Sequence, residues 1–190
     1  MSTKKDKFNH KDHFYMNLAL NLARERLGLT GENPSVGCVI VKNDEVISFG
    51  QTGLNGIPHA EYNAIKSCKK NLKGSKIYVT LEPCTHYGKT PPCSDIIIRS
   101  KIKEVIFSII DPDIRTKSKS FKIFKKKRIK VKFGLLQNEV KKIYKPYIYN
   151  KSKKLPFVTG KLAISKDKFI YSKKQKKITN KYSDGISHLL

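Results

Sequence analysis

The chain has 190 residues, 38% of them hydrophobic, which is enough for one well-packed domain with a smaller additional segment. Its formal net charge is +25, but the basic residues are mostly lysines spread over nearly every segment. Because proteins that recognise bases and phosphates favour arginine, we attribute the charge to composition and expect no specific nucleic-acid partner. No run reaches the roughly 18 apolar residues of a membrane span, and the N-terminus lacks a signal-peptide core, so a cytoplasmic protein without membrane contact is expected.

The first part of the chain predicts a helix, a hairpin and a second helix. Residues 12–27 place apolar side chains at helical spacing and are followed by Gly28, a common helix stop. Two β-type runs, 36–41 and 46–49, are separated by a short polar connection suited to a hairpin. Pro58 suits the first position of a helix, where its missing N–H has no intrahelical partner, so a helix is expected to start at about His59.

Strands and helices alternate in the rest of the chain. The patterns predict strands at 77–81, 105–110 and 129–133, and helices at about 93–100, 120–127 and 137–147. A helix, two strands and then alternation predict a three-layer α/β sandwich. Beyond a polar linker at 151–154, the apolar residues 157–165 predict one more strand.

Three side chains have the chemistry of a hydrolytic zinc site. Such a site needs three protein ligands and an open fourth position for water, and thiolate and imidazole suit this ion. His59, Cys84 and Cys93 meet that count, and each lies where a strand end meets a helix start, so we expect one Zn²⁺ per chain. Zinc lowers the pKa of a bound water to about 7, and Glu61, two residues after the histidine, is placed as the catalytic proton carrier.

The spacing of these residues is informative. His-x-Glu followed by Pro-Cys and a second Cys is typical of zinc base deaminases, in which the cysteines form Cys-x-x-Cys. Here eight residues, 85–92, separate Cys84 from Cys93, so a loop that could cover the metal and hold substrate is inserted inside the motif. The remaining cysteines, Cys38 and Cys68, have no ligand neighbours in sequence and are expected to pack in the core.

Four segments carry a more specific pattern. They are 33–37 (Asn-Pro-Ser-Val-Gly), 58–61 (Pro-His-Ala-Glu), 81–93 (Leu-Glu-Pro-Cys-Thr-His-Tyr-Gly-Lys-Thr-Pro-Pro-Cys) and 111–113 (Asp-Pro-Asp). In this order they resemble the deaminase domain of the bifunctional riboflavin-biosynthesis deaminase/reductase family. The resemblance implies the cytidine-deaminase-like fold, an α/β/α sandwich around a mixed sheet.

The resemblance also implies a substrate. It would be 2,5-diamino-6-ribosylamino-4(3H)-pyrimidinone 5′-phosphate, a phosphorylated pyrimidine, which would give 5-amino-6-(5-phosphoribosylamino)uracil and ammonia, with Glu61 moving the protons. Family positions matching Asn33 and Lys89 contact substrate, Asp111 occupies another pocket position, and His86 is a further substrate-binding candidate. Chemically, an amide can hydrogen-bond a pyrimidine edge and an ammonium can contact a phosphate.

The expected organisation has three parts. These are a polar segment at 1–11, the zinc deaminase domain at 12–150, and a linker with the start of a reductase-like domain at 151–190. The family's second half is a reductase that uses NADPH; residues 161–167 resemble its opening strand and 178–189 its continuation, after which the chain stops. The NADP site and the reductase activity are therefore expected to be absent. Residues 114–120 also lack the glycines that are common in the family after Asp-Pro.

Two other functions stay open at this point. A tRNA adenosine deaminase would use the same zinc chemistry and a basic surface, but the inserted loop argues against it. An inactive, truncated or regulatory binding module is the alternative of another class, and the intact set of His59, Glu61, Cys84 and Cys93 argues against simple loss of the active site. A homo-oligomer is compatible with the sequence, which does not determine the oligomeric state.

Overall fold

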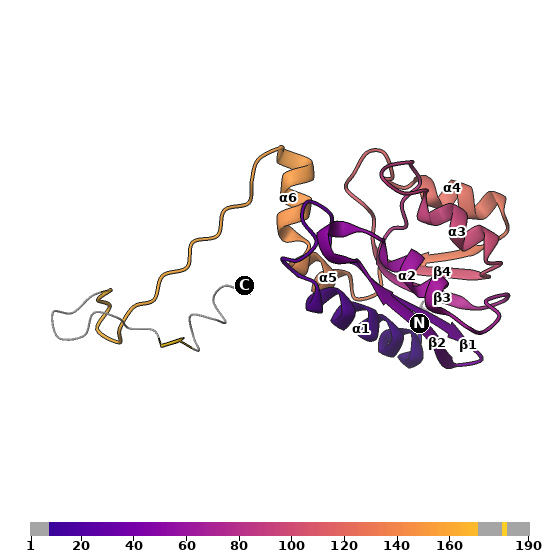
Figure 1. Cartoon of the computed structure of the whole chain (residues 1–190), viewed down its shortest axis with the longest axis horizontal. Helices are drawn as coiled ribbons and strands as arrows, with labels where there is room; N and C mark the ends of the chain where they lie inside the picture. The colour runs from indigo at the N-terminus through magenta and orange to yellow at the C-terminus, as the bar shows by residue number, and fades with distance from the viewer. Residues whose placement is uncertain (1–7, 171–179, 182–190) are drawn as a thin grey trace, which may run out of the picture. The chain divides into compact units, whose positions relative to one another are not determined.

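The computed structural model describes residues 8–170 and 180–181. The chain divides into two compact units, Met1–Leu155 and Pro156–Leu190. The five-stranded sheet and the helices that pack on it lie in the first unit (Figure 1). The division into segments 1–11, 12–150 and 151–190 stays a prediction about domain boundaries.

A mixed sheet forms the middle layer. Its strands lie in the order β2-β1-β3-β4-β5. Strand β1 pairs antiparallel with β2 and β3, whereas β3, β4 and β5 run parallel. The strands are β1 (Gly37–Lys42), β2 (Glu45–Gln51), β3 (Lys76–Leu81), β4 (Glu104–Ile109) and β5 (Lys130–Phe133). The predicted hairpin is confirmed: Asn43 and Asp44, with φ of 51° and 61°, form a two-residue turn that suits the strand twist.

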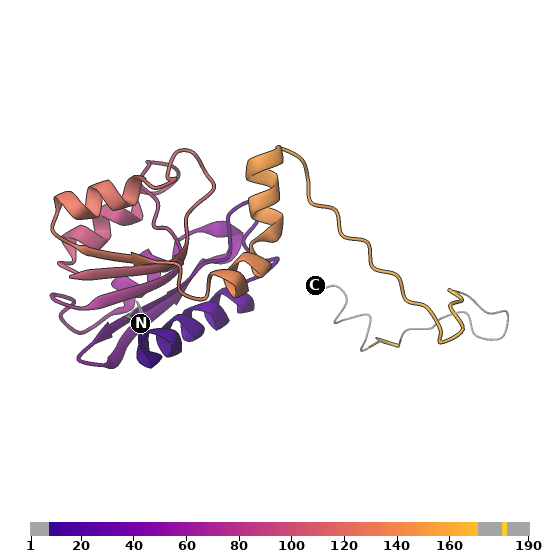
Figure 2. The same ribbon diagram turned by 180° about the vertical axis from the view of Figure 1, so that it is seen from behind.

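Helices cover both faces of this sheet, which confirms the three-layer architecture. Helices α1 (His10–Glu25) and α5 (Gln137–Ile143) cover one face; α2 (Ala60–Ser67), α3 (Cys93–Arg99) and α4 (Lys119–Lys126) cover the other (Figures 1 and 2). Successive side chains of a strand point to opposite faces of the sheet, so each strand contributes to the hydrophobic core on both faces. In β3, Tyr78 packs on the face covered by α1, while Ile77 and Val79 pack on the opposite face. Cys38 is fully buried as predicted, but Cys68 is partly exposed at the end of α2 and its assignment to the core was wrong.

Helix α1 begins two residues earlier than its apolar pattern indicates. Asn9 and Asp12 form a reciprocal capping box, in which each side chain accepts a hydrogen bond from the other residue's backbone N–H. Asp12 is buried and also accepts a 2.6 Å hydrogen bond from the Tyr78 hydroxyl of β3. The cap therefore fixes the start of α1 and ties it to the centre of the sheet.

Two predictions about helix boundaries need correction. His59 has extended backbone angles and is the N-cap of α2, so Pro58 lies before the helix and not at its first position. The single helix predicted at 137–147 is two helices, α5 and α6 (Lys145–Lys153), which meet at Tyr144. Pro146 explains the break, because it has no N–H to continue the hydrogen bonds of α5.

The strand predicted at 157–165 is absent. These residues are described, but they have neither helix nor strand structure, and most are exposed. An apolar run becomes a strand only when a neighbouring backbone supplies hydrogen-bond partners. The continuation predicted at 178–189 lies outside the described residues, apart from 180–181.

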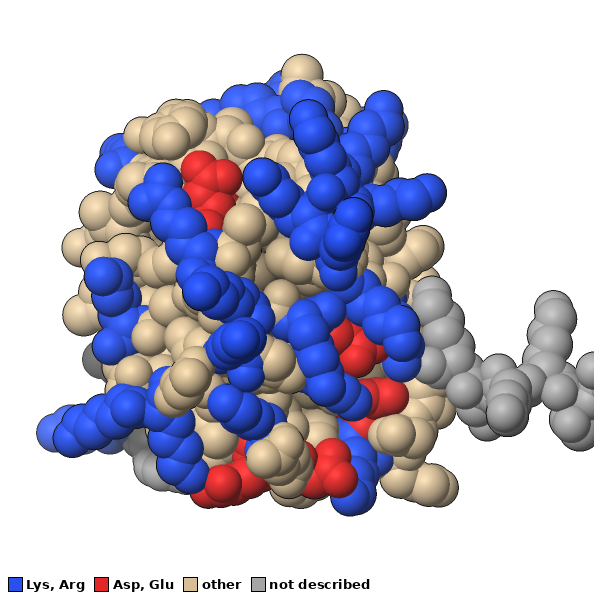
Figure 3. All heavy atoms as spheres, turned by 90° about the vertical axis from the view of Figure 1, so that its right-hand side faces the viewer, with Lys and Arg blue, Asp and Glu red and all other residues tan. Residues whose placement is uncertain are grey.

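The surface of the fold is rich in cations. Figure 3 shows Lys and Arg side chains spread over most of one face, with uncharged residues between them and few acidic ones. The lack of a specific nucleic-acid partner stays a prediction. Within the described part of the chain, no helix is long and apolar enough to cross a membrane.

Candidate metal centre and active site

The three predicted metal ligands lie together at the carboxyl end of β3. His59 is the N-cap of α2, Cys84 follows β3, and Cys93 opens α3. The Nδ1 atom of His59 is 3.5 Å from Cys84 Sγ and 3.4 Å from Cys93 Sγ. All three ligand atoms lie within 4.8 Å of one another. The inserted loop thus returns Cys93 to the side of Cys84.

The donor set fits zinc. A tetrahedral zinc ion with about 2.3 Å to sulfur and about 2.05 Å to nitrogen places these two ligands about 3.6 Å apart. The observed N···S distances of 3.4 and 3.5 Å match that spacing. One imidazole and two thiols also leave a fourth position free, as zinc hydrolases require. His59, Cys84 and Cys93 therefore form the His/Cys/Cys set of a zinc site.

Cys84 lies in surroundings that favour a thiolate. Its Sγ accepts a 3.2 Å hydrogen bond from the backbone N–H of Cys93, and its carbonyl accepts one from Ser94 N–H at 3.1 Å. Both donors belong to the first turn of α3, where backbone N–H groups are unpaired within the helix. Hydrogen bonds from Cys93 and His59 lower the pKa of Cys84 to about 4. These hydrogen bonds therefore favour the thiolate form of Cys84, which is the form that binds a metal.

Glu61 lies in the first turn of α2, beside the ligands. This residue is only 4% exposed. Burial and the negative charge of Cys84 raise the pKa of its carboxyl group to about 7. The carboxyl group is thus close to the metal ligands and shielded from bulk water.

A cavity of about 520 Å³ opens above these groups, and it brings all predicted site residues together except Cys93. Asn33, His86, Lys89 and Asp111 line it with His59, Glu61 and Cys84. Cys93, the third ligand, is buried and lines a neighbouring cavity.

Two of the predicted substrate-binding residues are held by hydrogen bonds. Asn33 donates a 3.0 Å hydrogen bond from Nδ2 to the Gly56 carbonyl, which fixes the orientation of its amide. Asp111 Oδ1 accepts from Tyr147 Oη and from Asp113 N, each at 2.9 Å. Burial raises the pKa of the Asp111 carboxyl to about 6.

The loop after β4 supplies the second wall of the cavity without glycines. Instead, the buried carboxylate of Glu82 holds the conformation of this loop through direct hydrogen bonds. Its two oxygens accept from the backbone N–H groups of Asp111, Ser118 and Ser120, and from the Ser120 hydroxyl at 2.6 Å. Glu82, which lies two residues before the ligand Cys84, therefore anchors the 114–120 segment.

The cavity is also lined by residues that the sequence did not single out as candidates. Asp113, Arg115, Tyr147 and Lys151 all line the cavity. Arg115 and Lys151 hold the pKa of the Asp113 carboxyl far below its usual range. Lys151 comes from α6, 92 residues after His59 along the chain. The Asp-Pro-Asp run was the only sequence signal near them, and nothing in the pattern connected it with α6.

Comparisons with known proteins agree with this site. The sequence model of the family described as "Cytidine and deoxycytidylate deaminase zinc-binding region" matches residues 9–109. A diaminohydroxyphosphoribosylamino-pyrimidine deaminase of Buchnera aphidicola is 44% identical over 146 residues, which cover 77% of this chain and 99% of that protein. The riboflavin biosynthesis protein RibD of Aquifex aeolicus is 38% identical over 181 residues, 94% of this chain but 51% of that protein.

The solved structures give the same result. A diaminohydroxyphosphoribosylaminopyrimidine deaminase/5-amino-6-(5-phosphoribosylamino)uracil reductase from Thermotoga maritima matches with a TM-score of 0.86 and 37% identity, covering 95% of this chain and 53% of that one. The chain thus spans about half the length of the bifunctional relatives it matches.

The fold and the His/Cys/Cys set together define a zinc-binding protein of the cytidine-deaminase-like class. Within this class the chain belongs to the riboflavin-biosynthesis RibD family, in which it corresponds to the deaminase part. The resemblance inferred from the 81–93 run is confirmed.

Proposed function

We propose that this protein is the zinc-dependent deaminase that converts 2,5-diamino-6-ribosylamino-4(3H)-pyrimidinone 5′-phosphate into 5-amino-6-(5-phosphoribosylamino)uracil and ammonia. The observation that carries the proposal is the single cavity that joins two of the zinc ligands, His59 and Cys84, and Glu61 to the predicted substrate-binding residues Asn33, Lys89 and Asp111. The Buchnera deaminase, which is matched over 99% of its length, supports the substrate. The enzyme would act in the cytoplasm, where reducing conditions keep Cys84 and Cys93 available as thiolates.

Glu61 is the proton carrier in this proposal. Zinc, when bound, supplies a Lewis acid that makes water nucleophilic at neutral pH. The water oxygen forms a bond to the ring carbon that carries the 2-amino group. Glu61 takes one proton from the water and delivers it to the adjacent ring nitrogen. It then moves the second proton from the new hydroxyl group to the amine, so that the C–N bond breaks and ammonia leaves.

The remaining cavity residues orient the pyrimidine. The Asn33 amide is fixed by its hydrogen bond to Gly56, and its Oδ1 is the atom we assign to the 2-amino group or a ring N–H. Asp111 is held by Tyr147 and is assigned to another edge of the ring. Lys89 and His86, on the inserted loop, are assigned to the ribose phosphate end. Fixed polar groups of this kind raise the fraction of productive encounters.

Ammonia release by the zinc-loaded full chain tests the proposal. The wild type is expected to release ammonia from the diaminopyrimidine phosphate, and Glu61→Gln is expected to reduce kcat by roughly 100-fold or more, the usual contribution of a general acid–base. Lys153→Ala, an exposed substitution on α6, is the matched control and should leave the rate unchanged. Equal activity of wild type and Glu61→Gln would contradict the mechanism. Ammonia release from tRNA adenosine but not from the pyrimidine would contradict the substrate.

A further inference from the structure

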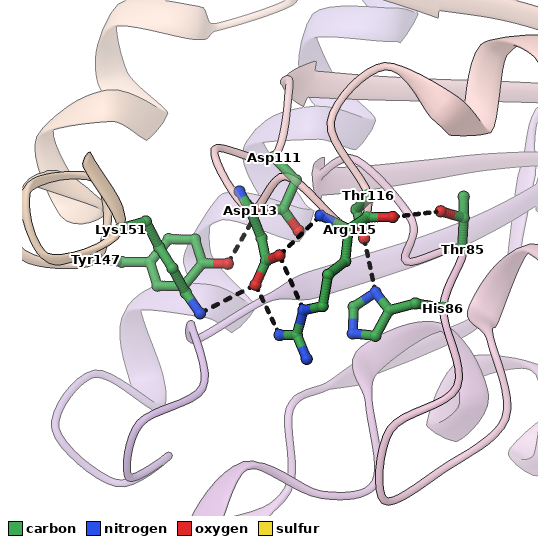
Figure 4. A network of polar contacts seen from close by, with 8 residues as sticks. All are labelled: Thr85, His86, Asp111, Asp113, Arg115, Thr116, Tyr147 and Lys151. Atoms are coloured by element: carbon green, nitrogen blue, oxygen red, sulfur yellow. Dashed lines mark hydrogen bonds and ion pairs between the residues drawn. The ribbon is translucent and has the colours of Figure 1, made fainter. Parts of the chain in front are cut away.

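Asp113 holds two cations at one edge of the metal cavity. Its Oδ1 accepts from Arg115 Nε at 2.9 Å, and its Oδ2 accepts from Arg115 Nη2 at 2.7 Å and from Lys151 Nζ at 3.0 Å. Figure 4 shows the ends of Arg115 and Lys151 both meeting this carboxylate, Lys151 from the left and Arg115 from the right. Because both nitrogens contact one oxygen, the guanidinium and the ammonium are close neighbours.

The arrangement exposes positive charge and buries negative charge. The Asp113 side chain is 8% exposed, whereas those of Arg115 and Lys151 are 56% and 27% exposed. One carboxylate faces two cations, which leaves a net charge of about +1 for the cluster toward solvent and the cavity. The carboxylate is also saturated, since the Arg115 backbone N–H at 3.0 Å completes its set of donors.

Both cations retain hydrogen-bond donors. Arginine has five N–H groups and lysine has three, and Asp113 uses two of the former and one of the latter. Among the described residues no other hydrogen-bond acceptor contacts the Arg115 guanidinium or the Lys151 ammonium, although the ammonium also lies over the Tyr147 ring, 5.6 Å from its centroid. Charge-assisted hydrogen bonds to phosphate oxygens are the interaction that such donors favour.

Neighbouring loops fix the position of the cluster. The Arg115 carbonyl accepts a 3.2 Å hydrogen bond from the Thr85 hydroxyl, and Thr116 Oγ1 lies 3.1 Å from His86 Nδ1 (Figure 4). These contacts connect the wall after β4 to the loop inserted between the two cysteines. Arg115 is therefore held beside the inserted loop, which also carries Lys89, and both line the same cavity.

We propose that Arg115 and Lys151, held together by Asp113, bind the phosphate group of the substrate and make the enzyme selective for phosphorylated pyrimidines. This inference rests on the proposed deaminase function and adds two binding residues to it. Helix α6 then supplies a substrate-binding residue in addition to its packing role. Lys89 would contact the same end of the substrate from the inserted loop between Cys84 and Cys93.

Binding of inorganic phosphate tests the site independently of catalysis. We expect isothermal titration calorimetry to show that Arg115→Ala and Lys151→Ala each raise the phosphate Kd about tenfold, the loss of one partly exposed charge-assisted hydrogen bond. The matched control is Lys153→Ala, which removes an exposed lysine of the same helix outside the cavity. Unchanged phosphate binding in both cavity variants would overturn the proposal. Circular dichroism at 222 nm verifies that each variant is folded.

Turnover of two compounds separates phosphate recognition from a structural role. The substrate and its dephosphorylated ribosylamino form are compared at equal zinc content. The two variants should raise KM for the phosphorylated compound about tenfold while leaving kcat/KM for the dephosphorylated compound unchanged. Equal losses for both compounds would overturn the proposal, because they would indicate a merely structural effect. If the wild type deaminates neither compound but phosphate binding responds as expected, the anion site stands and the proposed function fails.

Discussion

Removal of the Glu82 carboxylate provides a direct test of how the cavity wall is held. Glu82 is 2% exposed and accepts four hydrogen bonds, three from backbone N–H groups of residues 111–120 and one from the Ser120 hydroxyl. Glu82→Ala would leave these donors without an acceptor in a largely buried region. Hydrogen bonds to charged groups contribute about 1.5–3 kcal/mol each but are not additive. We expect a loss of about 3–5 kcal/mol in the free energy of unfolding.

Glu82→Gln should be less harmful, for a reason specific to this network. Each carboxylate oxygen accepts two hydrogen bonds, so an amide NH₂ in either orientation faces at least one N–H donor. The Ser120 hydroxyl can rotate and accept, which favours the orientation with NH₂ toward Ser120. One N–H then stays unpaired, and we expect a loss of about 1–2 kcal/mol.

Urea denaturation of the zinc-loaded protein, followed by far-ultraviolet circular dichroism, measures these changes. Glu139→Gln is the control, because Glu139 is exposed on α5 and should change stability by less than about 0.5 kcal/mol. Faster amide hydrogen exchange at Ser118 and Ser120 should accompany the loss in Glu82→Ala. A loss below about 1 kcal/mol for Glu82→Ala would refute the idea that this carboxylate anchors the wall.

Three further changes are predicted. Cys93→Ser should lower bound zinc, measured by atomic emission, well below one per chain, while Cys68→Ser keeps it unchanged; equal zinc in both would show that the third ligand was misassigned. The pKa of Asp111 is raised from 3.8 to about 6, so the protonated carboxyl favours the folded state. This contribution to the free energy of unfolding is full below about pH 4 and is lost as the pH rises through 6. Urea titrations of Asp111→Asn should lack this loss of up to about 3 kcal/mol, and a parallel pH profile would contradict the assignment. Gly50→Ala would place Cβ 2.5 Å from the Ala60 carbonyl, so we expect α2 to shift and stability to fall by about 3 kcal/mol; an unchanged urea midpoint would argue against that contact.

The sequence alone identified the zinc ligands because their chemistry is local. His59 and Glu61 share one helix turn, and Cys84 and Cys93 flank one loop, so residue type and spacing reveal most of the set. The alternation of apolar runs likewise predicted the three layers and nearly every strand, since periodicity follows directly from burial of one or both faces.

Other features depended on long-range contacts. Tyr144, where α5 and α6 meet, has a buried hydroxyl that lies 2.6 Å from Thr80 Oγ1 and donates to Ser35 O, and no local pattern predicts these contacts with residues more than 60 positions away. The run at 157–165 is apolar enough for a strand, but strand formation requires a partner backbone that local sequence does not specify. Helix boundaries also shifted where a side-chain cap, as at Asn9, decided the first residue.

The composition and motif spacing of this chain thus determined its layers, its metal chemistry and its family. Only the tertiary structure placed Asp113, Arg115 and Lys151 in one cluster, because Lys151 is 38 residues from Asp113 along the chain and reaches it through the packing of α6. The hydropathy pattern along a helix or strand indicates whether a residue lies on its buried or its exposed face. The distance between two loops and a helix depends on how the whole core packs, and that packing decides what the cavity beside the zinc ligands can bind.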